Sequence, residues 1–205
     1  MQITLSDGTQ MWMNSGTQVE VPVVFSRKCR ELKLLEGEIL LDVSKDASRS
    51  FIVDTWAGKV EVMGTRFDVL ADRDENLFST ALLEGKVQVT SKIDPDDKCI
   101  LNPNDIATMV DGTLNVRRVK DVSAIDSWSI GLIDVTDVPF DILMKKFEKA
   151  FDVRIFIDRQ DLPVVTYTRG KIRVSDGIVH ALSVLQLASD FSYSFDRVTN
   201  TVIIR

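Results

Sequence analysis

The stretch Leu34-Leu-Glu-Gly-Glu-Ile-Leu-Leu-Asp-Val43 decides the fold class of the first half of this chain. After its glycine, Ile39, Leu41 and Val43 occupy every second position, which is the side-chain period of a β-strand. Its first four letters recur at Leu82-Leu-Glu-Gly85. Both copies place paired leucines before a glycine, which tolerates backbone bends that a side chain resists. The repeated motif therefore predicts a recurring corner, at which one strand ends and another leaves.

Short strands are predicted on both sides of this motif. An Asp7-Gly8 pair between the alternating segments 3–5 and 11–13 predicts an opening β-hairpin. Further short apolar alternations are bounded by glycine or charged turn residues, at Phe51–Val53, Val60–Val62, Phe67–Val69 and Val87–Val89. Short strands at regular intervals are typical of a β-sandwich or roll. We therefore expect residues 1–122 to form a mainly β domain, a sandwich or roll of short strands.

Three glycines interrupt the alternation where a side chain would otherwise pack, and these are Gly37, Gly64 and Gly85. A side chain at each position would bury apolar surface, so its absence needs a backbone reason. We expect each of the three to occupy a bend, a bulge or a positive-φ conformation.

The sequence pattern changes near Trp128. Asp137-Val-Pro139 is a helix-start signal, with aspartate as the expected cap and proline in the first turn. The apolar residues that follow recur at helical spacing, and they are Phe140, Leu143, Met144, Phe147 and Phe151. This spacing predicts an amphipathic helix of about three turns.

The rest of the tail predicts a second helix and several strands. Ser175-Asp-Gly177 is expected to cap the second helix, whose apolar stripe is Ile178, Ala181, Leu182 and Leu185. Strands are predicted at Leu132–Val135, Val153–Ile157, Val164–Thr168, Phe191–Phe195 and Val202–Ile204. The resulting order is β-α-β-β-α-β-β, so residues 123–205 are predicted to form a small α+β domain with two helices on one sheet.

Composition and charge narrow the classes of function. The chain has 205 residues, of which 44% are apolar, with 25 basic and 31 acidic residues. The basic residues are scattered rather than gathered in a stripe, so no nucleic-acid partner is expected. No apolar run approaches the roughly 20 residues that span a bilayer, so the chain is expected to be soluble as given. A targeting or anchoring segment is expected only upstream of Met1.

Residues with catalytic or metal-binding chemistry do not combine into a site. His180 is the only histidine and lies inside a predicted helix, which does not favour a histidine-based catalytic triad. Cys29 and Cys99 lack C-x-x-C spacing, so zinc is not expected, and whether they form a disulfide stays open. Asp94-Pro-Asp-Asp97 lacks the calcium-loop pattern and indicates a solvated turn. We therefore expect neither an enzyme nor a cofactor.

Two alternative functions stay open beside a protein-binding role. Glu36 and Glu84 are candidates for the carboxylates of a glycan hydrolase, which must lie roughly 5 to 10 Å apart in a cleft. Trp12 and Trp56 are candidates for the flat platform of a carbohydrate-binding β-module. Tryptophan in a strand is, however, more often part of a core.

An ordered series of motifs carries a family resemblance, and its segments are 7–15, 34–46, 51–53, 62–69 and 83–87. The most specific is Val62-Met-Gly-Thr-Arg-Phe-Asp-Val69, with Gly64, Thr65 and Phe67 at its centre. In this series the chain resembles the FecR family of trans-envelope anti-sigma regulators. The segment from Trp128 onward resembles the C-terminal domain of Bacteroidota-type members, which is similar to the short signalling domain of secretins and TonB-dependent transporters.

The resemblance implies a relay rather than a reaction. A TonB-dependent outer-membrane transporter would present its signalling domain to the periplasmic part of the regulator, and this contact would change the activity of an ECF-type sigma factor across the inner membrane. The resemblance further implies that this chain is the periplasmic part, with the single membrane span and the sigma-binding segment upstream of Met1. It implies no cofactor, and it implies structural roles for Gly37, Gly64, Thr65, Phe67 and Gly85.

The partner surface is expected on the C-terminal domain, at a helix face or a sheet edge. Beyond its core stripe, the second helix carries Val179, Val184 and Leu187, more apolar surface than a helix covering one sheet requires. This surplus indicates either packing against the β-rich domain or a partner site. The next candidate is the last strand, expected at an edge, with Val202 and Ile204.

Overall fold

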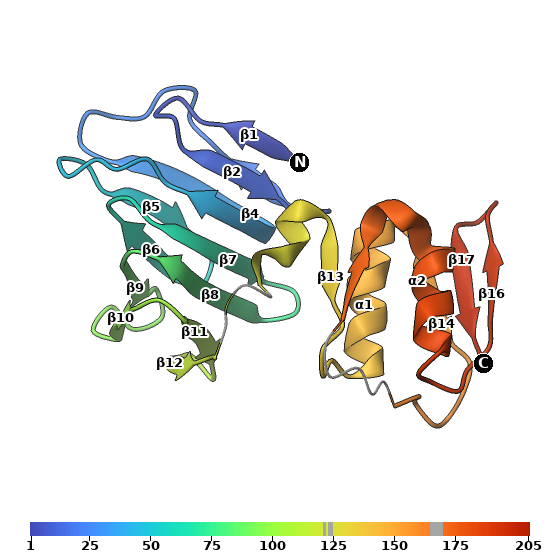
Figure 1. Cartoon of the computed structure of the whole chain (residues 1–205). Coiled ribbons are helices and arrows are strands. Elements are labelled where there is room, and N and C mark those ends of the chain that lie inside the picture. The colour runs from blue at the N-terminus through green and yellow to red at the C-terminus, as the bar shows by residue number, and fades with distance from the viewer. Residues whose placement is uncertain (121, 123–124, 165–169) are drawn as a thin grey trace. The chain divides into compact units, whose positions relative to one another are not determined.

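The structure is a computed structural model that describes residues 1–120, 122, 125–164 and 170–205. Its elements are labelled in Figure 1. The chain divides into two compact units, Met1–Ser129 and Ile130–Arg205. The expected strand Val164–Thr168 lies outside the described residues except for Val164, which belongs to no strand.

The first unit is built from strands, which confirms the predicted sandwich or roll. In its described part, twelve strands join into one continuous sheet. They are β1 (Gln2–Thr4), β2 (Gln10–Met13), β3 (Gln18–Glu20), β4 (Arg30–Asp42), β5 (Phe51–Asp54), β6 (Gly58–Val62), β7 (Arg66–Asp72), β8 (Leu77–Glu84), β9 (Val87–Ser91), β10 (Lys98–Leu101), β11 (Asp105–Val110) and β12 (Thr113–Arg118). Residues 3–89, all of which are described, contain no helix, as the period-two pattern predicts.

Strand β4 carries the first LLEG motif and connects two halves of this sheet. Its first part pairs with β3 and, in parallel, with β5, whereas residues 37–42 pair with β7 and residues 39–42 also with β2. We call the two halves half-sheet I and half-sheet II. Half-sheet I contains β1, β2, the second part of β4, β7, β8, β11 and β12, and half-sheet II contains β3, the first part of β4, β5, β6, β9 and β10.

The three motif glycines lie where the chain passes between the half-sheets. Gly37 lies within β4, Gly64 between β6 and β7, and Gly85 between β8 and β9. Their φ angles are +99°, +154° and +98°, so the expectation of positive φ is confirmed. An added Cβ would lie 2.6 Å from Thr17 Oγ1 at Gly37 and 2.8 Å from Lys45 Cα at Gly64. The second LLEG motif is the predicted corner, because β8 ends at Glu84 and β9 begins at Val87. In the first motif β4 continues through Gly37, where only glycine fits without strain.

One apolar core fills the space between the half-sheets. In β5, β6 and β9, every second residue is buried. The core includes Met11, Ile39, Leu41, Phe67, Val69 and Leu82 from half-sheet I, and Leu32, Leu34, Phe51, Val53, Val60 and Val89 from half-sheet II. Period-two burial thus fixes which residues face inward.

A buried arginine ties three segments together at one end of this core. Arg30 opens β4, and its side chain is 1% exposed. Its Nη1 donates to Asp7 Oδ2 at 2.9 Å and to the carbonyl oxygen of Ser44 at 2.7 Å. Its Nη2 donates to the carbonyl oxygen of Arg49 at 2.9 Å, and the guanidinium lies 5.5 Å from the centre of the Phe51 ring. Arg30 therefore holds the opening hairpin and the loop after β4 against the start of β4.

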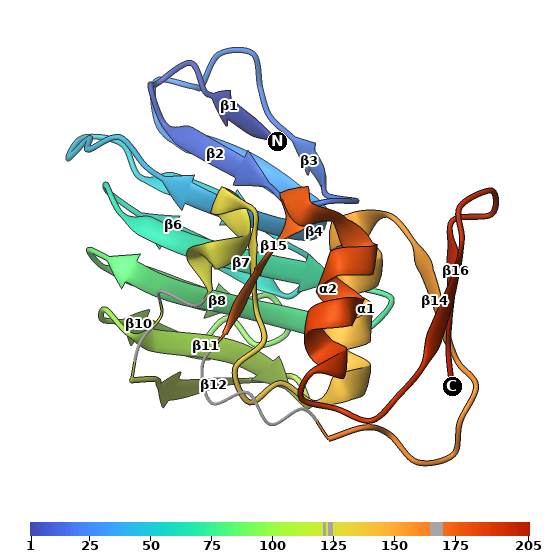
Figure 2. The same cartoon turned by 45° about the vertical axis from the view of Figure 1, so that its right-hand side comes forward.

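In its described residues the second unit has the order β-α-β-β-α-β-β, but its third strand, residues 171–173, is not the predicted segment, and the strands form two sheets rather than the one expected. Its elements are β13 (Leu132–Asp134), α1 (Phe140–Phe151), β14 (Arg154–Ile157), β15 (Lys171–Arg173), α2 (Gly177–Gln186), β16 (Tyr193–Asp196) and β17 (Thr201–Ile204). Strands β14, β17 and β16 form one sheet in that order, and β13 pairs with β15. Figures 1 and 2 show α1 and α2 side by side on one face of the three-stranded sheet. The predicted stripes of both helices are buried there, except for Phe151, which is partly buried.

Both helix starts differ from the sequence expectation. The N-cap position of α1 is Pro139 and has no side-chain cap, because Asp137 lies in the preceding turn with φ +51°. A carboxylate caps a helix only from the N-cap position. Helix α2 begins at Gly177, and Asp176 makes no capping hydrogen bond because its own backbone is already helical.

The last strand is not at an edge of its sheet, so that expectation is wrong. Strand β17 pairs in parallel with β14 and antiparallel with β16, and it therefore lies between them. The parallel pairing arises because the chain crosses over the sheet before β17, which no local pattern records.

Candidate functional site

The outer face of half-sheet I carries a buried row of side chains. Directly paired residues run across five strands, from Trp12 through Leu40, Asp68 and Ala81 to Ile106. We call these five residues the outer row. The last four are at most 4% exposed, although none of them belongs to the core between the half-sheets. Side chains on the outer face of a sheet are buried only when another segment covers them.

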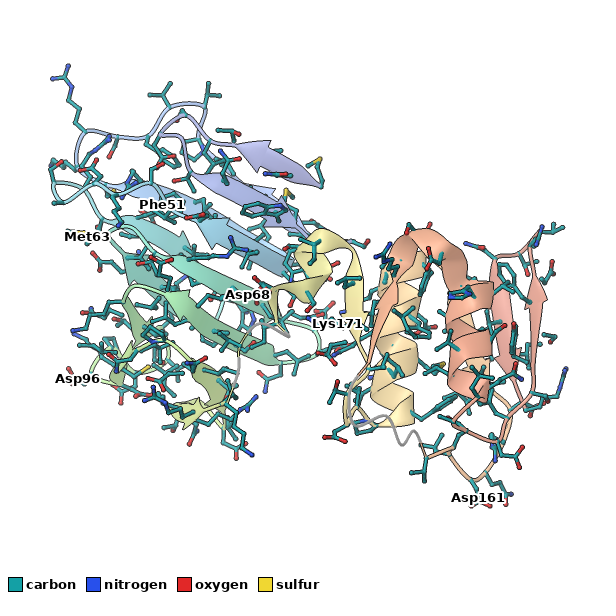
Figure 3. All side chains as sticks on the ribbon, in the orientation of Figure 1. Phe51, Met63, Asp68, Asp96, Asp161 and Lys171 are labelled. Atoms are coloured by element: carbon teal, nitrogen blue, oxygen red, sulfur yellow. The ribbon has the colours of Figure 1, made fainter. Side chains whose placement is uncertain are left out.

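The last residues of the first unit lie against this face. The short 3₁₀ helix η1 spans Asp126–Ile130. The indole Nε1 of Trp128 donates to Asp68 Oδ2 at 3.2 Å, and Arg66 Nη2 donates to Asp126 Oδ2 at 3.1 Å. We call residues 126–129 the strap, and Figure 3 labels Asp68 beside it.

The strap is a closed turn with one buried side chain. Ser129 Oγ donates to the carbonyl oxygen of Asp126 at 2.7 Å, and Ser127 is 1% exposed. Trp128 itself is half-buried. The indole of Trp128 joins the strap to the sheet through its hydrogen bond to Asp68.

Asp68 is an ionisable group in an apolar setting, only 2% exposed. Burial raises the pKa of its carboxyl group well above the usual range, and the nearby charges of Glu38 and Asp126 raise that pKa further. The hydrogen bond from Trp128 acts in the opposite direction and lowers the pKa. The site as a whole favours the neutral form of Asp68.

Arg66, two residues before Asp68 in β7, contacts other side chains. Arg66 pairs with Asp126 and lies 4.0 Å from Asp42, and its guanidinium lies 5.6 Å from the centre of the Trp12 ring. Its side chain is 32% exposed, so this ion pair is partly solvated. Arg66 therefore helps to hold the strap at its Asp126 end.

The residues expected at the partner surface have different environments. Leu187, which follows α2, is 85% exposed, and Val179 on α2 is 41% exposed. Val184 is partly buried and packs against the core of the second unit. Val202 and Ile204 are fully buried in that core, because β17 is the central strand. The structure thus separates Leu187 and Val179, which are accessible, from the two buried strand residues.

Other exposed apolar and basic side chains lie in the second unit. Ile142 on α1 is 43% exposed, and Phe156 on the edge strand β14 is 58% exposed. The same helix exposes Lys145, Lys146 and Lys149. The helical surface of this unit is therefore mixed, apolar and basic.

The residues of the two alternative functions lie in separate surroundings. Glu36 and Glu84 are both exposed, and neither lines a pocket of about 460 Å3 that is formed by Asp7, Arg30, Ser44, Lys45, Asp46, Ala47, Ser48 and Arg49. Trp12 lies in the outer row. Trp56 packs against the inner core, and its Nε1 donates to the carbonyl oxygen of Leu77 at 3.3 Å. The two tryptophans therefore do not share one exposed platform.

The remaining candidate catalytic and metal-binding residues do not form a shared site in the described part of the chain. His180 on α2 is 56% exposed and lies 3.9 Å from Asp176. Cys29 and Cys99 are free thiols, and burial, together with the charge of Asp97, raises the pKa of Cys99. Among the described residues, no group of three or more His, Cys, Asp and Glu side chains is placed to hold a metal ion. In the same residues, no helix has the length and apolar character needed to cross a membrane.

Comparison with protein families accounts for both units. Residues 1–88 match the family model described as FecR protein, and residues 133–204 match the model described as FecR, C-terminal. The chain belongs to the FecR family. The resemblance noted in the sequence is thereby confirmed.

Solved structures share the fold of this FecR-family chain. Two crystal structures of a candidate anti-sigma factor from Parabacteroides distasonis, at 1.65 Å and 2.50 Å resolution, match it with TM-scores of 0.81 and 0.80. Each is 24% identical, and each match covers 100% of this chain and 93% or 92% of the other. A search of curated proteins gave no significant match to the FecR-family chain.

Proposed function

We propose that this chain is the periplasmic sensor part of a transmembrane anti-sigma regulator. The observation that carries the proposal is the match of both FecR models, in order, along one chain. The shared fold with the candidate anti-sigma factor supports the same role. The regulator would hold its sigma factor through a segment upstream of this chain, and a single membrane span would separate that segment from the sensor.

The signal would come from the signalling domain of a TonB-dependent transporter that contacts the second unit. Two observations support a helical docking face there. Leu187 is almost fully exposed, and the adjoining α2 exposes Val179. Large exposed apolar side chains are enriched on binding surfaces. The lysines of α1 would favour an acidic rim on the partner.

A charge substitution at Leu187 tests this docking face. Leu187→Glu should weaken binding of the purified transporter signalling domain by about tenfold or more, which is typical of an apolar anchor at an interface. The melting temperature should stay nearly constant, because the side chain is 85% exposed. Binding is measured by titration calorimetry on the intact chain. Val184 is unsuitable for this test, because its side chain packs against the core.

Val198→Glu provides the matched control. Val198 is 94% exposed in the turn between β16 and β17, away from the helices. The Val198→Glu variant should leave both signalling-domain binding and thermal stability unchanged. If Leu187→Glu binds as tightly as the unmodified chain, α2 is not the docking face. If the unmodified chain itself fails to bind, the transporter relay is wrong.

The regulatory role is tested separately in cells. Deletion of residues 130–205 from the full-length regulator should disconnect a sigma-dependent reporter gene from the transporter's ligand. Reporter activity that still follows the ligand after this deletion would contradict a role of the second unit in the relay.

A further inference from the structure

In the part of the chain that the structure describes, the strap is joined to the first unit by the 3.2 Å hydrogen bond from Trp128 to Asp68, by the Arg66–Asp126 ion pair and by the buried Ser127. The side chains of the ion pair are 32% and 24% exposed, so water competes for both charges. Segments with few buried contacts open at lower free energy than the core of the same domain.

The surface beneath the strap gains solvation when the strap leaves. The outer row places the carboxyl group of Asp68 between the apolar side chains of Leu40 and Ala81. Covering a carboxyl group removes its water, and the Trp128 indole donor replaces part of that hydration. The acids Glu38 and Asp126 add repulsion when Asp68 is charged. The closed strap therefore carries an electrostatic cost that the open strap lacks.

The chain that follows the strap is short and is anchored at its other end. The carbonyl oxygen of Gly131 accepts a hydrogen bond from Val174 N at 2.9 Å within the second unit. Only Ser129 and Ile130 lie between this anchor and Trp128, and three residue steps reach at most about 11 Å. Gly131 has φ +71° with open space around its Cβ position, and Ile130 is 70% exposed. If the Trp128–Asp68 hydrogen bond and the Gly131–Val174 hydrogen bond move further apart than this reach, one of the two must break.

We propose that residues 126–129 form a releasable strap that leaves the outer row while the core between the half-sheets stays folded. Release breaks the Trp128–Asp68 and Arg66–Asp126 contacts and exposes Asp68 in the outer row. Because the connection to Gly131 is short, movement of the second unit would pull residues 126–129 away from Asp68. This inference rests on the contacts of the first unit and does not depend on the identity of any partner.

Exchange of the Trp128 indole proton with water measures release directly. Each of the 3 tryptophans gives one indole N–H signal in a ¹⁵N-labelled intact chain, and replacement of each by phenylalanine assigns it. Arg66→Gln removes the ion pair of the strap. It should raise the exchange rate of the Trp128 proton by about two- to fivefold, the range expected from loss of a partly exposed ion pair. The Trp56 proton, bonded to the carbonyl oxygen of Leu77, should keep its rate.

Arg49→Gln is the matched control. Arg49 pairs with Asp46 in the same unit, and its side chain is 32% exposed, as is that of Arg66. This substitution should leave exchange at Trp128 unchanged. If Arg66→Gln and Arg49→Gln act alike, or if the Trp128 and Trp56 protons change together, the strap opens only when the whole unit unfolds and the proposal is wrong.

A second arm uses pH and does not remove the ion pair. Among the described residues, Glu38 on β4 and Asp126 on the strap carry charges that act on Asp68, and Arg66 on β7 pairs with Asp126. Because ionised Asp68 is better solvated with the strap open, exchange at Trp128 should grow faster between pH 5 and pH 8 than base catalysis alone explains. Asp68→Asn should remove this excess. Identical pH profiles of the two proteins would overturn the proposal.

Discussion

Gly64 and Gly16 both have positive φ, but only at Gly64 would an added Cβ meet backbone atoms. At Gly64 that Cβ would lie 2.8 Å from Lys45 Cα, whereas nothing lies within 4 Å of the corresponding position at Gly16. Gly64→Val should therefore destabilise the first unit by about 3 kcal/mol or more, from backbone strain together with the clash. Gly16→Val should cost about 1–2 kcal/mol from strain alone.

Urea denaturation of the two glycine variants measures this difference. Equal losses in the two variants would show that φ alone sets the cost. An unchanged midpoint for Gly64→Val would contradict a need for glycine at the crossing.

Asp68 should make stability depend on pH in a direction opposite to that of most carboxyl groups. Its pKa is raised in the folded chain, so the folded state holds its proton more tightly than the unfolded state does. The stability gained is present below the ordinary pKa of 3.8 and is lost as pH rises toward the raised pKa.

Asp68→Asn removes this titration and keeps an acceptor for Trp128. The difference in unfolding free energy, variant minus unmodified chain, should increase from pH 4 toward pH 8, by at most about 1.4 kcal/mol per pH unit. Thermal melts at a series of pH values give this difference. A difference that is constant across the series would show that burial does not control the titration of Asp68.

At the scale of elements, strand β4 is anchored through the ion pair of Arg30 with Asp7. Both side chains are almost fully buried, at 1% and 6% exposed. Arg30→Met should destabilise the first unit by about 3–5 kcal/mol, because it leaves the charge of Asp7 buried without its partner. Adding Asp7→Asn should recover part of this loss, and denaturation of the single and double variants gives the coupling energy.

The control for this anchor lies on the same strand. Lys33 and Glu20 are 3.4 Å apart, with side chains 57% and 60% exposed. Lys33→Met should change stability by less than about 1 kcal/mol. If Arg30→Met costs no more than Lys33→Met, Arg30 is not the anchor that its hydrogen bonds indicate.

Elements with strong periodicity could be predicted from the sequence, whereas elements defined by distant partners could not. The stripe of α1 and the strand alternation are local patterns, so their core positions follow directly. Strand β15 has three residues with one apolar side chain, Ile172, which is too little for a periodic signal. The central place of β17 depends on pairing with β14, far away in the sequence.

The strap site could not be predicted from the sequence either, because it also depends on a partner far away in the chain. Alternation places Asp68 on the outer face of β7, where a carboxylate is normally solvated. Its cover, Trp128, follows 60 positions later in the chain. The one local signal is the run Ile39-Leu-Leu41, in which consecutive apolar residues indicate a strand buried on both faces.

At the scale of the whole molecule, each unit has a separate apolar core. The core of the second unit includes Phe140, Leu143, Phe147, Leu182, Leu185, Val202 and Ile204. We expect a fragment of residues 130–205 to fold in isolation, because all of these residues lie inside it. Its amide spectrum should superimpose on the corresponding signals of the intact chain. A collapsed, poorly dispersed spectrum would contradict independent folding.

Strand β4 also imposes an order on synthesis. Its second part pairs on one side with β2, which precedes it, and on the other side with β7, which the ribosome makes only later. Until β7 emerges, the nascent chain presents this part of β4 as an open edge of unpaired amide and carbonyl groups, ready to join a strand of another chain. Folding of the first unit therefore competes with aggregation during translation, and slow elongation between β4 and β7 lengthens that exposure.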